Sequence, residues 1–216
     1  MKLPLIIDHR GCKYPGIREN SCKSVENSIK EGVDIVELDV VCAKDNNFIG
    51  YHPKLFQRKP LSTASNVDLF ESLLKTLDSR AMLYTDIKEN LTPGKMDALS
   101  GLIKKYHYKQ VIIGSYYLPV LRYFRQLQPT WIINYHCLAT RRSIQRAINV
   151  GANWINPIPY WVARRFVAEA TRKGLKFVPG GNENYQKQLR YAKFGAYALS
   201  VFKPAFFREW LKSRHV

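Results

Sequence analysis

Two carboxylates, Glu37 and Asp39, lie two residues apart in the apolar run VDIVELDVV (residues 33–41), and a histidine, His52, follows after a short polar break. In a β-strand, residues two apart share a face, so the carboxylates point one way and the apolar residues between them the other. Two buried carboxylates are costly unless a cation or basic side chains compensate their charge. The spacing therefore predicts a site for a metal ion or for positively charged groups.

The same spacing recurs in YTDIK, where Asp86 and Lys88 share one strand face, and the segment IIDHRG places His9 and Arg10 at the end of the first predicted strand. Together these segments supply carboxylates for a hard divalent cation, histidines for proton transfer and cations for an oxyanion. Such a set indicates metal-assisted cleavage of a phosphodiester. His136 ends another predicted strand and either faces this site or points away from it.

These residues belong to a regular alternation of short β-branched runs and longer segments of helical period. The runs predict strands over residues 3–9, 34–41, 81–88, 110–116, 131–136, 154–159, 176–181 and 196–201, with 47–52 as an extension or return of the second strand. The intervening segments predict helices over residues 19–32, 65–78, 95–107, 118–128, 140–151, 161–174, 184–195 and 205–213.

Eight strand–helix units in a chain of 216 residues predict the α/β class and a compact, single-domain (β/α)8 TIM barrel over residues 1–216. An open doubly wound sheet is the competing architecture, but it typically uses fewer units, and no GxGxxG follows the first strand. In a barrel the outer strand faces pack against helices, so the carboxylates are expected to point inward. They lie late in their strand, at the end where barrel active sites form.

The chain carries 34 Lys and Arg against 17 Asp and Glu, a formal charge of +17 that favours anionic partners. The basic residues are spread at spacings typical of solvated helix faces, so a dedicated nucleic-acid patch is not expected. No apolar run suits a signal peptide or a spanning helix, and four cysteines without CxxC spacing indicate reduced thiols. We expect a cytoplasmic protein, with peripheral contact with an anionic membrane left open and the oligomeric state undetermined.

The ordered set HRG (9–11), ENS (19–21) and GVDIVELDV (32–40), followed by His52, resembles the glycerophosphodiester phosphodiesterase family of the PLC-like phosphodiesterase superfamily. The resemblance implies a β/α barrel that hydrolyses phosphodiesters of glycerol or related alcohols with a divalent metal, Mg or Ca. It leaves open which histidine protonates the leaving alkoxide. It makes Glu37, Asp39 and Asp86 the metal ligands, His9 and His52 the general acid and base, Arg10 and Lys88 the phosphate-binding residues, and Glu19 and Asn20 supports of the first loop and second shell.

The sequence departs from the family pattern at four places. Pro53 follows the second histidine where the family usually has Asp, and Asp86 stands where Glu is common. PGGN (179–182) replaces a WTVN-like strand, and LSVFKP (199–204) lacks the usual Thr-Asp. The segment between His52 and Asp86 is too short for the capping insertion of many bacterial relatives, which indicates an open mouth able to accept a lysophospholipid.

The predicted function is metal-dependent hydrolysis of glycerophosphodiesters or lysophospholipids to a phosphomonoester and an alcohol. Two alternatives stay open at this point. One is a phospholipase-D-like transphosphorylation, in which a hydroxyl of the substrate attacks and a cyclic phosphate forms. The other is a non-catalytic barrel that binds anionic lipid or nucleic acid through its charge.

Overall fold

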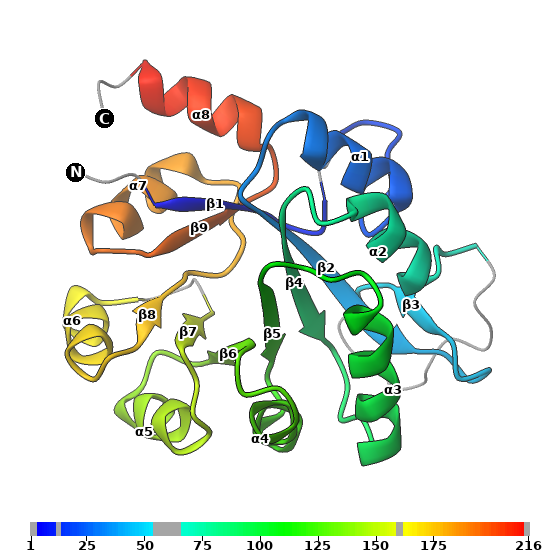
Figure 1. Cartoon of the computed structure of the whole chain (residues 1–216). Helices are drawn as coiled ribbons and strands as arrows, with labels where there is room; N and C mark the ends of the chain where they lie inside the picture. The colour runs from blue at the N-terminus through cyan, green and yellow to red at the C-terminus, as the bar shows by residue number, and fades with distance from the viewer. Residues whose placement is uncertain (1–3, 12–13, 54–65, 159–161, 214–216) are drawn as a thin grey trace.

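The computed structural model describes residues 4–11, 14–53, 66–158 and 162–213, which form an α/β barrel with helices around a ring of strands (Figure 1). Within these residues the sheet order is β8-β7-β6-β5-β4-β2-β1-β9, with β3 paired to β2. All neighbours along this path are parallel, and β3 is antiparallel to β2. The predicted barrel is confirmed.

The strands and helices alternate along the chain, as in the predicted strand–helix units. The strands are β1 (Leu5–Asp8), β2 (Ile35–Cys42), β3 (Phe48–Gly50), β4 (Met82–Ile87), β5 (Val111–Ser115), β6 (Ile132–Cys137), β7 (Trp154–Pro157), β8 (Lys176–Phe177) and β9 (Ala198–Val201). The helices are α1 (Cys22–Lys30), α2 (Phe70–Leu77), α3 (Pro93–Lys104), α4 (Leu118–Leu127), α5 (Arg141–Asn149), α6 (Arg164–Arg172), α7 (Tyr185–Lys193) and α8 (Pro204–Lys212).

The strand β8 is shorter than the predicted strand over residues 176–181. Pro179 lacks the amide hydrogen that a continuing ladder would need. Beyond it the chain passes close to the first strand, since a Cβ on Gly181 would lie 2.7 Å from Cγ of His9. The residues after β8 therefore form part of the mouth of the barrel instead of its wall.

The two end strands of the sheet, β8 and β9, meet at a seam. Among the described residues no β-ladder joins them. Two backbone hydrogen bonds cross the seam instead: the Tyr197 amide donates to the Phe177 carbonyl at 2.8 Å, and the Asn182 amide donates to the Ser200 carbonyl at 3.3 Å. The barrel is thus nearly closed.

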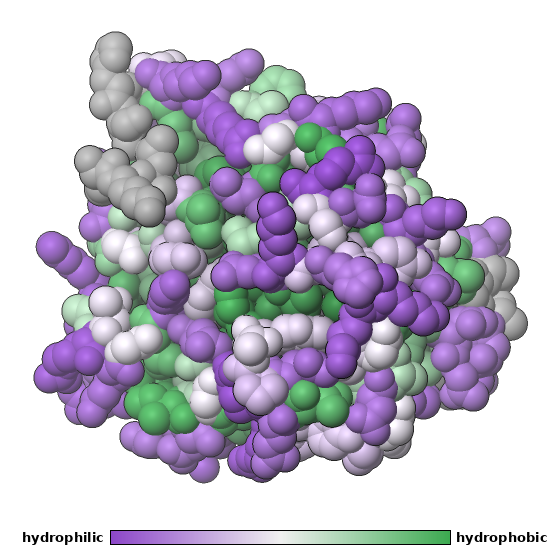
Figure 2. Space-filling view, viewed as in Figure 1, coloured by the Kyte–Doolittle hydropathy of each residue, from purple (hydrophilic) through white to green (hydrophobic). Residues whose placement is uncertain are grey.

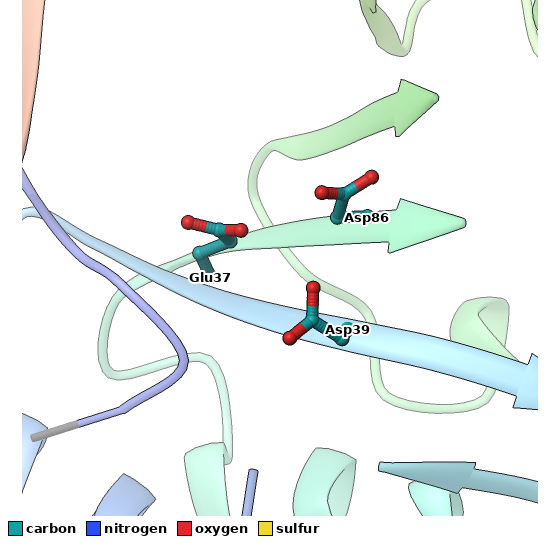
Figure 3. A group of neighbouring side chains, drawn as sticks. All are labelled: Glu37, Asp39 and Asp86. Carbon is teal, nitrogen blue, oxygen red and sulfur yellow. The ribbon is translucent and has the colours of Figure 1, made fainter. Parts of the chain in front are cut away.

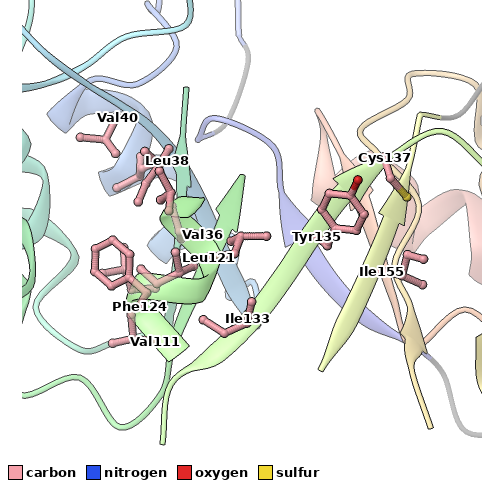
Figure 4. Close-up of a cluster of buried hydrophobic side chains, with 14 of the residues drawn as sticks. Val36, Leu38, Val40, Val111, Leu121, Phe124, Ile133, Tyr135, Cys137 and Ile155 are labelled. Atoms are coloured by element: carbon pink, nitrogen blue, oxygen red, sulfur yellow. The ribbon is translucent and has the colours of Figure 1, made fainter. Parts of the chain in front are cut away.

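Two hydrophobic layers hold the barrel together. The outer layer packs one face of the strands against the helices, for example Val36 and Leu38 of β2 with Leu121 and Phe124 of α4 in one buried cluster (Figure 4). A smaller cluster inside the barrel comes from the beginnings of the strands and from one residue after β8, and its buried members are Ile7, Ile35, Tyr84, Ile112, Trp154, Val178 and Ala198. The other end of the barrel interior is left for polar side chains.

Hydrophilic residues cover much of the face shown in Figure 2, between smaller hydrophobic areas. This agrees with basic residues spread over solvated helix faces. Among the helices that the structure describes, none has both the length and the apolar character needed to cross a membrane.

Candidate active site

Three carboxylates from two neighbouring strands meet inside the barrel. Glu37 and Asp39 lie on β2, and Asp86 lies on β4 in register with Asp39 (Figure 3). One oxygen from each carboxylate lies within 4.8 Å of the other two, and all three residues are buried. The strand alternation explains the arrangement, because the residues between them belong to the outer hydrophobic layer. Carboxylate oxygens so placed suit a hard divalent cation.

Two basic side chains compensate part of this charge. Lys88 contacts Asp86 and places its Nζ 2.8 Å from Oδ1 of Asp39, while Nε of Arg10 lies 3.3 Å from Oδ2 of Asp39. Burial opposes the ionisation of Asp39, but Lys88 and Arg10 outweigh it and lower the pKa of this carboxyl. The carboxylates in turn raise the pKa of Lys88 in spite of its burial. Asp39 and Lys88 are therefore charged.

Glu37 is the uncompensated member of the group. Burial, followed by repulsion from Asp39 and Asp86, raises its pKa well above the usual value. Asp86 also has an unsatisfied atom: its Oδ1 is buried and has no hydrogen-bond partner among the described residues. A divalent cation bound by all three carboxylates would use this oxygen and favour the ionised form of Glu37, so the residues present fit a metal ion.

Both predicted catalytic histidines lie beside the carboxylates. His9 follows β1, and its Nε2 lies 3.7 Å from Oε2 of Glu37, with a side chain only 12% exposed. His52 follows β3 and is partly exposed. Burial, and after it the charge of Arg10, lowers the pKa of His9, and burial also lowers the pKa of His52. Their imidazoles therefore favour the neutral form.

The loop between β1 and α1 is fastened to the same carboxylates. The Asn20 side chain donates from Nδ2 to Oδ2 of Asp39 at 2.8 Å and accepts from the Asp39 amide at 2.9 Å. Asn20 adopts a left-handed φ of 53° directly before Ser21, the N-cap of α1. Glu19 accepts a hydrogen bond from Arg10 at 3.1 Å. Asn20 thus contacts a carboxylate of the group directly, and Glu19 contacts it through Arg10.

A buried polar chain behind Asp86 includes residues that the sequence patterns did not single out. Nδ1 of His136 lies 3.5 Å from Oδ2 of Asp86, so this histidine faces the site. Its Nε2 hydrogen-bonds the hydroxyl of Tyr84, which accepts a hydrogen bond from Asn134 at 2.7 Å. Strand alternation could have identified Tyr84, which lies two residues before Asp86, and Asn134, which lies two before His136.

The contact between Tyr84 and His136 requires a glycine between them. The strand β5 separates β4 from β6, and its Gly114 faces the barrel interior. A Cβ at this position would lie 2.7 Å from the hydroxyl oxygen of Tyr84 and 2.8 Å from Nε2 of His136. Real Cβ atoms do not approach other atoms so closely, so Gly114 is needed for the polar chain to cross the barrel.

The segment that carries most of these residues matches a known family. Residues 9–58 match the model of the Glycerophosphoryl diester phosphodiesterase family. This match confirms the predicted resemblance, and with it the enzyme class that the resemblance implies, a phosphoric diester hydrolase. It includes every predicted site residue except Asp86 and Lys88, which the barrel brings to the same place. No sequence among curated proteins matches the chain significantly.

Solved structures share the fold over nearly the whole chain. A phosphodiesterase from Oleispira antarctica, solved with the product sn-glycerol-3-phosphate, superposes with a TM-score of 0.86 at 15% identity, covering 97% of this chain and 97% of its own. A glycerophosphodiester phosphodiesterase from Parabacteroides distasonis gives a TM-score of 0.84 at 20% identity, covering 99% and 98%. At these identities the similarity concerns the fold.

Proposed function

We propose that this chain, whose first motifs match the glycerophosphodiester phosphodiesterase family, is a metal-dependent enzyme that hydrolyses a glycerophosphodiester to a phosphomonoester and an alcohol. The observation that carries the proposal is the buried group of Glu37, Asp39 and Asp86 with His9 beside it at the carboxyl end of the strands. That end of a barrel is where active sites form.

In this proposal the three carboxylates hold a divalent cation, Mg or Ca. When bound, such a cation neutralises charge that develops on the phosphoryl oxygens. Arg10 and Lys88 add further positive charge on the same side of the barrel, where they bind phosphate oxygens. Asn20 and Glu19 keep Asp39 and Arg10 in place through the hydrogen bonds described above.

The proton transfers fall to His9 and His52. One imidazole accepts the proton of the attacking water, and the other donates a proton to the leaving alkoxide. The base must be neutral before the reaction, which burial favours for both imidazoles. The acid must first take up a proton, which the negative charge of a bound phosphodiester would favour by raising its pKa. The two imidazoles are close enough for His52 to influence the pKa of His9.

The test is turnover of the purified protein on glycerophosphocholine, lysophosphatidylcholine and bis(p-nitrophenyl) phosphate, with Mg, with Ca and with a chelator. We expect metal-dependent turnover that is lost in His9→Ala and Glu37→Gln. The control is His107→Asn, an exposed residue with φ of 48° that asparagine tolerates. Phosphorus NMR distinguishes a phosphomonoester from a cyclic phosphate. Lack of turnover of all three substrates with either metal would contradict the proposal and favour a binding barrel.

A further inference from the structure

Exposed apolar side chains gather at the mouth of the barrel. The described residues include seven large hydrophobic side chains that are exposed, and five of them lie in segments that lead from a strand into the first turn of the next helix. These five are Leu69, Tyr116, Tyr117, Leu138 and Phe206. The other two, Ile148 and Tyr197, lie at the opposite end of the barrel. Apolar side chains concentrated on one face indicate a surface that meets a partner.

Three of these side chains form one edge of the mouth, beside the candidate active site. Tyr116 and Tyr117 follow β5, and Leu138 follows the neighbouring strand β6. The Tyr116 ring meets the ring of His136 edge to face at a centroid distance of 5.1 Å, and His136 contacts Asp86. Leu138 is 64% exposed, so its aliphatic side chain gains little by packing within the fold. This apolar edge therefore borders the carboxylate group.

Basic side chains lie next to the same edge. The helices α5 and α6 follow the neighbouring strands β6 and β7, and each begins with two arginines (Figure 1). These are Arg141, Arg142, Arg164 and Arg165, all exposed. Of the four, only Arg141 forms an ion pair with a described residue, Glu169 at 3.5 Å, and its side chain is still 90% exposed. Most of this positive charge is therefore left uncompensated by the described residues.

The position of these arginines is unfavourable for the helices themselves. The beginning of a helix carries a partial positive charge, so acidic side chains are favoured there and basic ones are repelled. The first turns of α5 and α6 contain no acidic residue, whereas Arg146 and Arg172 lie in the last turns, where a positive charge is favourable. An anionic partner outside the chain would explain arginine pairs at the unfavourable ends.

The apolar side chains distinguish between two classes of anionic partner. A nucleic acid is bound by positive charge and by stacking on aromatic rings, and an aliphatic side chain such as Leu138 adds little to either. An anionic bilayer accepts both kinds of group together, because tyrosine rings and aliphatic side chains enter its interface while arginines attract lipid phosphates. Tyr116, Tyr117 and Leu138 beside the arginine pairs therefore favour a bilayer.

We propose that this part of the mouth docks peripherally on a bilayer that contains anionic phospholipids. The docking surface consists of Tyr116, Tyr117 and Leu138 with the arginine pairs that begin α5 and α6. Docking there turns the open end of the barrel toward the lipid headgroups. The proposal goes beyond the proposed function, because binding to a bilayer requires no turnover.

The test is co-sedimentation of the purified protein with vesicles of phosphatidylcholine alone or with added phosphatidylserine. We expect binding only to the vesicles that contain phosphatidylserine, and we expect salt to weaken it. The double variant Arg142→Gln/Arg165→Gln removes one arginine from the beginning of each helix and should weaken binding about tenfold. Both sites are exposed and glutamine favours helices, so folding is not at risk.

The matched control is Arg146→Gln/Arg172→Gln, which removes the same charge from the other ends of the same two helices. It should weaken binding by less than about threefold, because these ends face away from the bilayer. Equal losses in the two double variants would overturn the proposal, since the total charge of the protein would then explain the attraction. Absence of binding to phosphatidylserine vesicles would also overturn it.

Leu138→Gln tests the apolar part of the docking surface. It should weaken vesicle binding about fivefold, because less apolar surface enters the interface. The control is Ile148→Gln, which replaces an exposed aliphatic residue at the other end of α5 and should leave binding unchanged. Unchanged binding in Leu138→Gln would contradict the proposed surface.

Fluorescence anisotropy with labelled duplex DNA and single-stranded RNA tests the other class of partner. Tighter binding to either than to vesicles, weakened by Arg142→Gln/Arg165→Gln and not by Leu138→Gln, would overturn the proposal. Turnover measured on the same preparation separates docking from the proposed function. An inactive protein that binds the vesicles as expected would support docking and contradict the proposed function, and an active protein that does not bind them would do the reverse.

Discussion

The hydroxyl of Tyr84 donates a hydrogen bond to Nε2 of His136 across the inside of the barrel. The direction follows from the other ring nitrogen: Nδ1 lies 3.5 Å from the Asp86 carboxylate, which can only accept, so Nδ1 carries the proton and Nε2 accepts. Burial lowers the pKa of His136, with Asp86 opposing the shift, and the neutral ring fits this arrangement. The polar chain orients Oδ2 of Asp86 and leaves its Oδ1 available to a cation.

The first prediction concerns Gly114, which makes room for this contact. Gly114→Ala should lower the free energy of unfolding by about 1–3 kcal/mol, because its Cβ would collide with Tyr84 and His136. The control is Gly101→Ala in α3, where an added Cβ would meet no heavy atom within 4 Å among the described residues. That substitution should stabilise the protein by about 0.5–1 kcal/mol, because alanine favours the helix. Urea unfolding measures both, and equal stability of the two variants would contradict the proposed crowding.

A second prediction follows from the raised pKa of Glu37. The folded state binds the Glu37 proton more tightly than the unfolded chain does. The contribution of Glu37 to the free energy of unfolding is therefore fully present below its ordinary pKa of 4.5 and is lost as pH rises. In chelator, the wild type should match Glu37→Gln at low pH and become less stable than it as pH rises above about 4.5. Denaturant unfolding from pH 4 to 8 would show this, and a difference independent of pH would contradict it.

Lys88 provides the third prediction, because it contacts two buried carboxylates. Lys88→Met should destabilise the metal-free protein by about 3–5 kcal/mol, since it leaves buried charge unpaired. Lys105→Met is the control: its pair with Glu71 is exposed and should contribute less than about 1 kcal/mol. Added Mg or Ca binds the carboxylates in both variants and should stabilise Lys88→Met more than Lys105→Met, because there the cation also compensates the unpaired charge. Equal stabilisation of the two variants would contradict the role of Lys88 in compensating this charge.

The fourth prediction uses two asparagines with left-handed backbone. Asn20, at φ of 53°, makes two hydrogen bonds to Asp39, whereas Asn46, at φ of 63°, lies in an exposed turn. Alanine favours this left-handed conformation less than asparagine does, so both substitutions destabilise the backbone. Only Asn20→Ala also removes the two hydrogen bonds to Asp39. It should cost about 1–3 kcal/mol more than Asn46→Ala and weaken Mn²⁺ binding followed by electron paramagnetic resonance. Equal effects would mean that only the backbone matters.

Much of the barrel and of its charged group was predictable because both depend on local periodicity. Alternation over residues 33–41 placed Glu37 and Asp39 on the inner face, and the return of residues 47–52 along the second strand is seen as β3. The length of β8 was wrong by four residues, since the prediction extended to residue 181 and the strand ends at Phe177. There a proline and the contact with His9 outweigh strand propensity.

The polar chain could not be predicted in the same way. His136 was left open because the end of one strand does not fix which neighbour it faces across the barrel. Tyr84 belongs to the inner hydrophobic cluster, and its hydroxyl also takes part in the polar chain. The same holds for a cavity at the mouth of the barrel, whose lining residues, such as Tyr14 and Tyr185, come from segments far apart in sequence that only the closure of the ring brings together.

The ladder of β2 and β4 and the seam between β8 and β9 differ in how much their sequences can change. The carboxylates lie on β2 and β4, joined by a continuous ladder, and a backbone shift there would disturb all of them. The segments that follow β8 and β9 meet at the seam, which only two backbone hydrogen bonds cross among the residues described. Substitutions and small insertions in these segments can therefore be accepted during evolution while β2 and β4 stay unchanged. The seam is the part of the barrel wall that can diverge without moving the carboxylates.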